Sequence, residues 1–247
     1  MYRRLLEQID EKKRLLDAHW PPNKALSLKL REYLGVELTY TSNAIEGSSI
    51  TRQETLVILK HGLTVRGKPL VEHLEVINHE HAIKLVEELA QQEEPITEHA
   101  IRQIHTLILK GIDDENAGRY RRQQVFIAGS TYVPPDPADV PSLMDDFSRW
   151  LSDGPQVHGL HPVEYAAMAH YRFVAIHPFI DGNGRTARLL MNLLLMRHSY
   201  PIAIIKPEDR LDYYEAIEEA HGGKFEPFGL LIARAVDRMA DVYIRSL

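Results

Sequence analysis

Apolar side chains recur at helical spacing along almost the whole chain, and this pattern limits the fold more than any other feature. Residues 2–18 carry apolar positions among charges, and Pro21 and Pro22 should end that segment. The same criterion predicts further helices at residues 23–46, 51–61, 70–91, 97–110, 139–152, 161–175, 185–198, 208–220 and 226–245. The chain is therefore predicted to be α-helical.

Capping residues mark the ends of two of these helices. Thr51 followed by Glu54 matches a capping box, in which each side chain bonds a backbone N–H group of the other residue. Gly47 and Gly62 follow predicted helices, and glycine commonly ends a helix in the left-handed conformation. These residues predict one helix that stops before Gly47 and another between Thr51 and Gly62.

One segment departs from the helical pattern. Residues 123–135 read QQVFIAGSTYVPP, where β-forming residues flank an Ala-Gly-Ser tip and two prolines end the run. We predict a β-hairpin here. An isolated hairpin is only marginally stable in water, so this one should either pack on the helices or become ordered when a ligand binds. The expected fold is all-α with one small β-hairpin flap.

Length and composition exclude several classes of protein. With 247 residues and 44% hydrophobic side chains, the chain can bury a core without disulfides or structural metal. The absence of cysteine excludes a disulfide framework and a cysteine nucleophile. The first residues are charged, and no run reaches the roughly 18 apolar residues of a membrane span. We therefore expect a cytoplasmic protein without membrane contact.

The charge distribution argues against an extended nucleic-acid surface. The net charge is −6, and phosphate-backbone binding needs clustered Lys and Arg. The C-terminal segment, residues 233–247, mixes both signs, unlike a basic recognition helix. No DNA partner and no winged helix after the core are expected. The net charge does not exclude a single phosphate-binding pocket.

The densest chemical signal is one loop, residues 177–185, which leads into an apolar helix. The proline after His177 disfavours helix there, so the imidazole should lie at a loop edge. Gly182 and Gly184 flank Asn183 and let successive backbone N–H groups turn toward one point at the next helix start. Such a nest binds anions, phosphates above all.

Charged residues around this nest complete a reaction centre. Arg185 and Arg188 are three residues apart on the first turn and share a face, so both can reach the anion. Asp181 would repel bound phosphate unless a cation such as Mg²⁺ bridges them. His177 can take a proton from a hydroxyl that attacks phosphorus. The reaction class is phosphoryl or nucleotidyl transfer.

Each feature alone has an ordinary structural explanation. A lone His is more often a cap or core residue, Gly-Asn-Gly is more often a turn, and Arg is common at helix starts. The loop lacks the Gly-Lys-Ser/Thr ending of a phosphate loop and does not match the dinucleotide-binding pattern. The chemical interpretation depends on all these features falling within residues 177–188.

The residues His177-Pro-Phe-Ile-Asp-Gly-Asn-Gly-Arg-Thr-Ala-Arg188 resemble, without departure, the motif H-x-F-x-[DE]-G-N-G-R-x-x-R of the Fic (Fido) family. The resemblance extends from about residue 38 to 230 and is strongest to metazoan-type members and their bacterial relatives. It implies N-terminal helices at residues 1–50 and a catalytic core at residues 51–247. The implied activity is transfer of AMP from ATP, with Mg²⁺ or Mn²⁺, to a Ser, Thr or Tyr hydroxyl of a protein.

The resemblance also assigns roles within the motif. It implies that His177 is the general base, that Asp181 binds the metal and that Phe179 anchors the loop. The nucleotide would be held by the nest and by residues of the following helix, the flap and the helix near residue 213. The implied set is Gly182, Asn183, Gly184, Arg185, Thr186 and Arg188 for the phosphates, Val125 and Ile127 in the flap, and Tyr213, Tyr214, Ile217 and His221 around the adenine.

Family differences favour one nucleotide chemistry. Fic-like kinases replace the second glycine of the nest with lysine, whereas Gly184 is present here. AMP transfer is therefore favoured over phosphate transfer. Other nucleotides, or phosphocholine from a CDP compound, stay open because the motif binds a pyrophosphate and does not select a base.

A second family signature precedes the core. Residues 42–47, Ser-Asn-Ala-Ile-Glu-Gly, fit [ST]-x-x-x-E-[GN], as in members with an N-terminal inhibitory helix. By itself the pattern reads as a helix end with Glu46 exposed. Beside the catalytic motif it implies an inhibitory segment with Ser42 and Glu46, in which the carboxylate pairs with Arg188 and displaces the γ-phosphate.

Two other functions remain open. The chain could mainly remove AMP, with Glu46 positioning a water, or it could be a non-enzymatic, nucleotide-binding regulator. The sequence does not identify the target protein. Without a partner, the chain could modify itself. The resemblance alone suggests a homodimer through the surface around residues 60–75.

Overall fold

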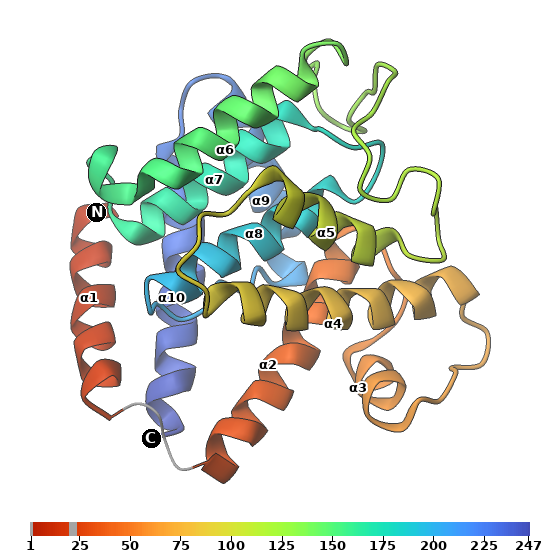
Figure 1. Ribbon diagram of the computed structural model, residues 1–247. Helices are drawn as coiled ribbons and strands as arrows, with labels where there is room; N and C mark the ends of the chain where they lie inside the picture. The colour runs from red at the N-terminus through yellow and green to blue at the C-terminus, as the bar shows by residue number, and fades with distance from the viewer. Residues whose placement is uncertain (1, 20–23) are drawn as a thin grey trace.

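The computed structural model describes residues 2–19 and 24–247, with no side chains described for 24–27. Within these ranges the chain forms ten α-helices and one 3-10 turn, which confirms the helical prediction (Figure 1). In chain order they are α1 (Tyr2–His19), α2 (Lys24–Ile45), α3 (Arg52–His61), α4 (Leu70–Ala90), α5 (Glu98–Leu109), α6 (Val140–Val157), α7 (Pro162–Ile176), α8 (Asn183–Arg197), η1 (Pro207–Asp209), α9 (Arg210–His221) and α10 (Glu226–Arg245).

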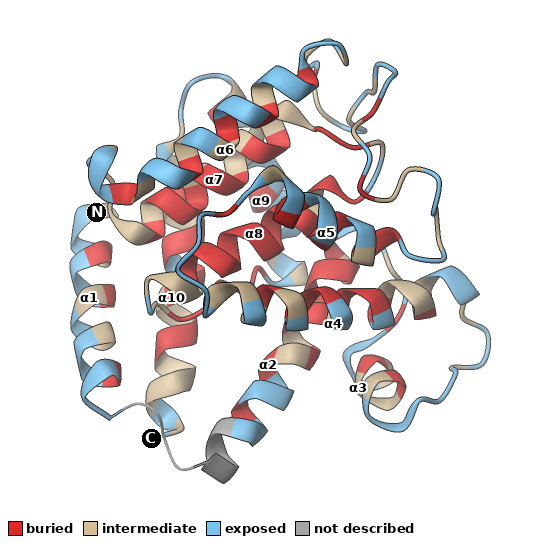
Figure 2. Ribbon diagram, viewed as in Figure 1, coloured by how far each residue is buried: buried red, intermediate tan, exposed pale blue. Residues whose placement is uncertain are grey.

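Helix α8 lies at the centre of the molecule and packs against α7, α4 and α5. Its residues are buried on all sides, as Figure 2 shows by the red ribbon through the middle of the fold. Leu189, Leu190 and Leu193 are fully buried. A helix that is apolar around its circumference must be surrounded by other helices. The start of α8 is therefore held rigidly, and it carries the predicted anion-binding nest.

A buried amide fixes the other end of α8. Asn192 is fully buried, and its Nδ2 donates to the Ala203 carbonyl at 3.1 Å. The Ala203 N–H donates to Asn192 Oδ1 at 2.7 Å. Residues 201–206 are without regular structure, so this side chain supplies bonds that a neighbouring strand or helix would otherwise make.

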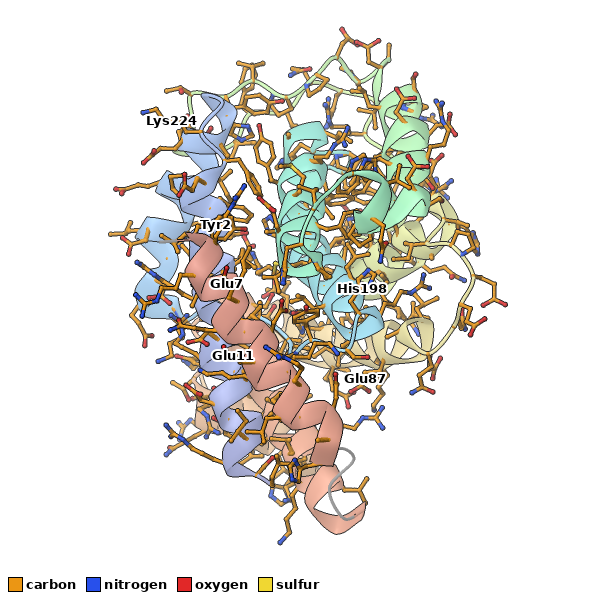
Figure 3. All side chains as sticks on the ribbon, turned by 90° about the vertical axis from the view of Figure 1, so that its left-hand side faces the viewer. Tyr2, Glu7, Glu11, Glu87, His198 and Lys224 are labelled. Atoms are coloured by element: carbon orange, nitrogen blue, oxygen red, sulfur yellow. The ribbon has the colours of Figure 1, made fainter. Side chains whose placement is uncertain are left out.

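The two N-terminal helices share the core of the other helices. Helix α1 lies along α10, with Glu7 and Glu11 on its outer side (Figure 3). Leu6 and Ile9 of α1 and Ile45 of α2 join the same apolar cluster as α8. A division at residue 50 stays a prediction. Pro21 and Pro22, which should end the first helix, lie outside the described residues.

The predicted helix ends are confirmed. Thr51 and Glu54 form both bonds of the capping box, with Thr51 N–H to Glu54 Oε2 at 2.7 Å and Glu54 N–H to Thr51 Oγ1 at 3.3 Å. Gly62 has φ of +63° and Gly47 has φ of +101°, both in the left-handed region. Helix α6 continues to Val157, past the predicted end at 152, through a kink at Gly154.

The predicted β-hairpin at residues 123–135 is wrong. Within the described residues this flap segment contains no strand. Its arms are joined by a side chain, since Gln124 Nε2 donates to the Pro134 carbonyl at 2.9 Å. Pro134 and Pro135 have no N–H to donate to a ladder, and two short arms form few backbone bonds. The tip is held instead by Glu218 of α9, which accepts from Ser130 Oγ at 2.6 Å.

None of the described helices combines the length and the apolar composition that a membrane span requires. The surface around residues 60–75 exposes Leu63 at 57% and Leu70 at 70%. Its role in a homodimer stays a prediction.

We expect Asn192→Ala to lower the free energy of unfolding by about 3 kcal/mol, because it leaves the Ala203 N–H and C=O buried without partners. Urea denaturation followed by circular dichroism measures this change. Gln103→Ala, at an exposed position of α5, is the control and should change stability by less than about 0.5 kcal/mol. Equal stability of the two variants would contradict the role given to Asn192.

Candidate active site

His177 follows the last residue of α7 in a left-handed conformation, with φ of +51°. This conformation is uncommon for residues other than glycine and needs support from its surroundings. Arg121 supplies it, because its Nε donates to the His177 carbonyl at 2.8 Å and its backbone N–H donates to the Pro178 carbonyl at 2.9 Å. As predicted, α7 ends before His177 and presents the imidazole from a loop.

The environment of His177 keeps its imidazole neutral. Burial lowers the pKa of His177 to about 4, although a backbone hydrogen bond with Val174 and the charges of Glu46 and Asp181 act in the opposite direction. A histidine with this pKa is unprotonated near pH 7. It can therefore accept a proton from a hydroxyl.

The loop after His177 is closed by its own asparagine. Asn183 Oδ1 accepts from the Phe179 N–H at 3.0 Å, and Asn183 Nδ2 donates to the Phe179 carbonyl at 2.9 Å. The Phe179 ring is fully buried, in agreement with the predicted anchor. The Asn183 side chain is thus used within the loop, so only its backbone N–H is left for a ligand.

The start of α8 offers free backbone donors. The first helical bond runs from the Thr186 N–H to the Gly182 carbonyl at 3.0 Å. The N–H groups of Asn183, Gly184 and Arg185 precede that bond and have no acceptor within the helix. They form the positive end of the helix dipole, where phosphate binds well. The side chain of Thr186 is fully buried beneath them.

Arg185 is paired with two carboxylates. Its guanidinium is 4% exposed and lies 2.8 Å from Glu75 Oε1 and 3.3 Å from Asp181 Oδ2. Burial raises the pKa of Glu75, while the charge of Arg185 lowers it. Any phosphate that takes Arg185 as a ligand must therefore compete with Glu75 of α4, a residue that no sequence pattern indicated.

Asp181 is the most accessible carboxylate of the loop. Its side chain is 66% exposed, and Oδ1 accepts from the Gly182 N–H at 2.6 Å. No group of three or more His, Asp or Glu side chains able to hold a metal occurs within the described ranges. A Mg²⁺ ion commonly binds one or two carboxylates together with phosphate oxygens and water. The single exposed Asp181 fits that mode of binding.

Glu46 lies directly against Arg188. The Oε1 atom of Glu46 is 2.7 Å from Arg188 Nη2, and Arg188 also donates from Nε to Ser42 Oγ at 2.9 Å. Arg188 is only 3% exposed. Burial alone would lower the pKa of Arg188, but the charge of Glu46 outweighs it and the pKa is raised. The structure thus brings together Ser42, Glu46 and Arg188 from α2 and α8.

Gly184 leaves room for this ion pair. A Cβ atom at position 184 would lie 2.4 Å from Glu46 Oε1 and 3.0 Å from Arg188 Nη1. A side chain there would have to displace the Glu46 carboxylate. The glycine therefore serves the ion pair as well as the backbone of the nest.

The residues predicted around the adenine lie in two different environments. Tyr213 is 1% exposed, and its hydroxyl bonds to His170 Nε2 at 2.9 Å beneath Arg188. Tyr214 is 40% exposed and donates to the Ile45 carbonyl at 3.3 Å.

His221, also predicted near the adenine, lies against the flap. Its ring stacks on that of Tyr132 with 3.7 Å between the ring centroids, which brings the flap tip to α9. Ile127 of the flap and Ile217 of α9 are partly buried. Their contact with adenine stays a prediction.

Comparison with known proteins agrees with this geometry. Residues 95–195 match the model of the Fic/DOC family. A solved fragment of Fic-1 from C. elegans is 32% identical with a TM-score of 0.89, and the match covers 99% of this chain and 72% of that one. This chain belongs to the Fic family.

Other Fic proteins match over nearly the whole chain. A Fic domain containing signaling protein from Bacteroides thetaiotaomicron is 28% identical with a TM-score of 0.88, covering 98% of this chain and 97% of that one. "Protein adenylyltransferase Fic" from Nematostella vectensis is 42% identical over 98% of this chain and 56% of its own length. The chain thus spans about half the length of the curated relatives it matches.

His105, like Glu75, is a residue of this Fic protein that the sequence did not indicate, because it lies far from the motif. His105 of α5 stacks on Phe179 at 3.6 Å, and its Nε2 lies 2.8 Å from the Asp181 carbonyl. The Gly118 N–H donates to Nδ1 at 2.9 Å, so Nε2 carries the proton and donates to the loop. A histidine on the apolar face of a helix is usually a core residue, so only the fold reveals this contact.

The buried histidines should make this Fic protein sensitive to acid. Burial lowers the pKa of His79 and His170 to about 3 and that of His105 and His177 to about 4. The unfolded chain, with ordinary pKa values near 6.5, binds more protons below that pH. The free energy of unfolding should be highest above pH 6.5 and fall as the pH drops, with uptake of about three or four protons on unfolding near pH 5.

Urea denaturation at pH 7.5, 6 and 5 measures this dependence. His79→Gln should reduce the uptake on unfolding by about one proton. His99→Gln replaces an exposed histidine and should leave the pH dependence unchanged. A constant free energy of unfolding between pH 7.5 and 5 would contradict the neutral state of these side chains.

Proposed function

We propose that this Fic protein is a protein adenylyltransferase that moves AMP from ATP to a hydroxyl group of a protein. The observation that carries the proposal is the arrangement of His177, neutral and buried, beside the free N–H groups at the start of α8. The curated relatives named protein adenylyltransferase support the same activity. ATP and a Ser, Thr or Tyr side chain are the proposed substrates.

The proposed reaction is a displacement at the α-phosphorus. The hydroxyl oxygen of the target forms a bond to the α-phosphorus as the bond to the bridging oxygen breaks, and pyrophosphate leaves. His177 takes the hydroxyl proton during the attack. Backbone N–H groups of Asn183 and Gly184 hold the developing negative charge without reorganisation, because α8 is fixed in the core.

Asp181 would hold the divalent cation, Mg²⁺ or Mn²⁺, that accompanies ATP. Its exposed carboxylate lies next to the nest, where phosphate oxygens complete the ligand set. The cation would neutralise phosphate charge as pyrophosphate leaves. Within the chain, Glu75 holds Arg185 in place beside this carboxylate.

We propose further that Glu46 inhibits transfer. In this proposal the γ-phosphate binds the Arg188 guanidinium, which Glu46 occupies at 2.7 Å. A phosphate cannot replace the carboxylate unless Glu46 leaves a charge-assisted bond to a buried guanidinium. ATP would then bind with its α-phosphorus poorly placed for in-line attack.

We expect Glu46→Gly to raise AMP incorporation by about tenfold or more over the wild type, because Arg188 becomes available to the γ-phosphate. The measurement is incubation with Mg²⁺ and α-labelled ATP, with and without cell extract as a source of targets, followed by gel and intact-mass analysis. Glu46→Gly/His177→Ala should not label. Glu93→Gly removes an exposed carboxylate from a loop and should behave like the wild type.

The other outcomes separate the competing functions. If no variant labels, but wild type releases AMP from a target modified beforehand and Glu46→Gly does not, the protein removes AMP. If ATP binds and neither reaction occurs, it is a nucleotide-binding regulator. Equal labelling of all variants would overturn the roles of Glu46 and His177.

The pKa of His177 also predicts the pH dependence of transfer. With a pKa of about 4, the imidazole of the free enzyme stays unprotonated at pH 5.5. We therefore expect kcat/KM for ATP in the Glu46→Gly variant to fall less than about twofold between pH 7 and pH 5.5. An ordinary imidazole would give a fall of about eightfold over the same range. Initial rates at each pH measure this dependence, and circular dichroism checks that the protein stays folded. A fall of about eightfold would contradict a buried, neutral His177 as the base.

A further inference from the structure

Four arginines surround a hollow at the base of the flap segment. The hollow has a volume of about 660 Å³ and contains a single acidic residue, Asp136, in its lining. It lies between the start of the flap, the residues just after the flap, and α5. The lining residues are Arg102, Arg119, Tyr120, Arg121, Arg122, Asp136, Pro137, Ala138 and Pro141.

The chain neutralises only part of the positive charge in this hollow, because the charge of Asp136 acts on Arg121 but no described carboxylate forms an ion pair with any of the four arginines. Arg102 Nε donates to the Gly118 carbonyl at 2.6 Å, and Arg121 bonds to the carbonyls of His177 and Pro135. Carbonyl acceptors satisfy hydrogen bonds but bring no negative charge. Arg119 and Arg122 are exposed, and none of the four arginines forms an ion pair with a described residue.

This concentration of charge contrasts with the rest of the protein. The chain has a net charge of −6, whereas the hollow sets four positive charges against one negative. Several other surface arginines are paired with acids, as Arg149 is with Asp145 and Asp146 and Arg31 is with Glu87. Like charges held together without counter-ions repel one another, so such a cluster favours an anionic partner.

The hollow is directly connected to the candidate active site. Arg121 forms part of its lining and holds the His177 carbonyl at 2.8 Å and the Pro178 carbonyl at 2.9 Å. Arg122, just before the flap segment, and Asp136, just after it, both line the hollow, so the flap segment leaves the hollow and returns to it. A chain lying along the flap would therefore pass over the hollow as it leaves the site.

We propose that this hollow docks an acidic segment of the protein that receives AMP, with Asp and Glu residues close in sequence to the acceptor hydroxyl. The inference rests on the proposed transfer of AMP to protein and adds a preference for its substrate. Guanidinium groups bind carboxylates with directed, paired hydrogen bonds. Exposed flap residues, Phe126 at 80% and Val133 at 59%, offer apolar contacts beside the charged hollow.

Binding can be tested without nucleotide. The probe is a fluorescein-labelled peptide with one serine flanked by Asp and Glu, and the control peptide carries Asn and Gln at those positions. Fluorescence anisotropy with the full chain should show binding of the acidic peptide alone, weakened by added salt. Arg119→Glu/Arg122→Glu should weaken it by about tenfold.

Two further variants keep the test specific. Arg3→Glu/Arg4→Glu makes the same change of charge on exposed positions of α1, on the opposite side of the molecule in Figure 1, and should bind like wild type. Asp136→Asn removes the acid of the hollow while keeping an oxygen that can accept from the Ala138 N–H, and it should bind more tightly. If both arginine pairs weaken binding equally, or if the neutral peptide binds as well as the acidic one, the docking proposal is overturned.

Transfer is measured separately in the Glu46→Gly variant. Faster AMP transfer to the acidic peptide, reduced by Arg119→Glu/Arg122→Glu, would support both proposals. Charge-dependent binding without transfer would keep the docking surface and count against the adenylyltransferase. Equal transfer to both peptides would keep the enzyme and overturn the docking surface. A last outcome is that ATP displaces the peptide from the wild type but not from Arg119→Glu/Arg122→Glu. The hollow would then be a phosphate site, and the proposal of an acidic docking segment would be overturned.

Discussion

The buried guanidinium of Arg188 is the interaction on which the candidate site depends. A charge that is 3% exposed is costly unless it is fully hydrogen-bonded and paired. Its partners come from separate elements, with Ser42 and Glu46 at the end of α2 and Tyr213 on α9. The same group thus joins the end of α2 to the core and lies where the proposed γ-phosphate would bind. The packing of α2 on the core and the proposed inhibition of transfer therefore depend on the same buried guanidinium.

The loop that carries the proposed base is held in a similar way by groups that leave the reacting atoms free. Within the loop, Arg121 and His105 form hydrogen bonds only to backbone carbonyls, those of His177, Pro178 and Asp181. Asn183 closes the loop on itself through Phe179. The backbone that carries His177 and the first N–H groups of α8 is therefore held by side chains that take no part in the proposed chemistry. Such pre-organisation is what electrostatic stabilisation of a transition state requires.

The flap segment links the two ends of the proposed substrate path. Its tip is held to α9 by Glu218 and by the stacking of Tyr132 on His221, beside the predicted adenine position. Its base adjoins the arginine hollow, whose Arg121 supports the His177 carbonyl. A target lying along the flap would contact α9 at the tip and the arginine hollow at the base. Side chains rather than a backbone ladder hold this segment.

The sequence by itself determined the helices, their caps and the catalytic loop, because these depend on local physics. Apolar spacing at the helical period predicted every helix, and the capping box at Thr51 and the glycines at 47 and 62 predicted the ends. Proline after His177 and the glycines at 182 and 184 predicted a loop opening a helix N-terminus. Each of these signals acts over a few residues, so no tertiary contact was needed to read it.

Only the tertiary structure decided which distant residues support the loop and how the flap is held. Glu75 reaches Arg185 across 110 residues of sequence and His105 reaches Asp181 across 76, and no local pattern marks either residue. The flap has the composition of a hairpin, yet Glu218 and the two prolines favour an arm held by side chains. Such contacts are set by the packing of α4 and α5 on α8 and of α9 on α10 and α7, and packing joins residues that the order of the chain keeps apart.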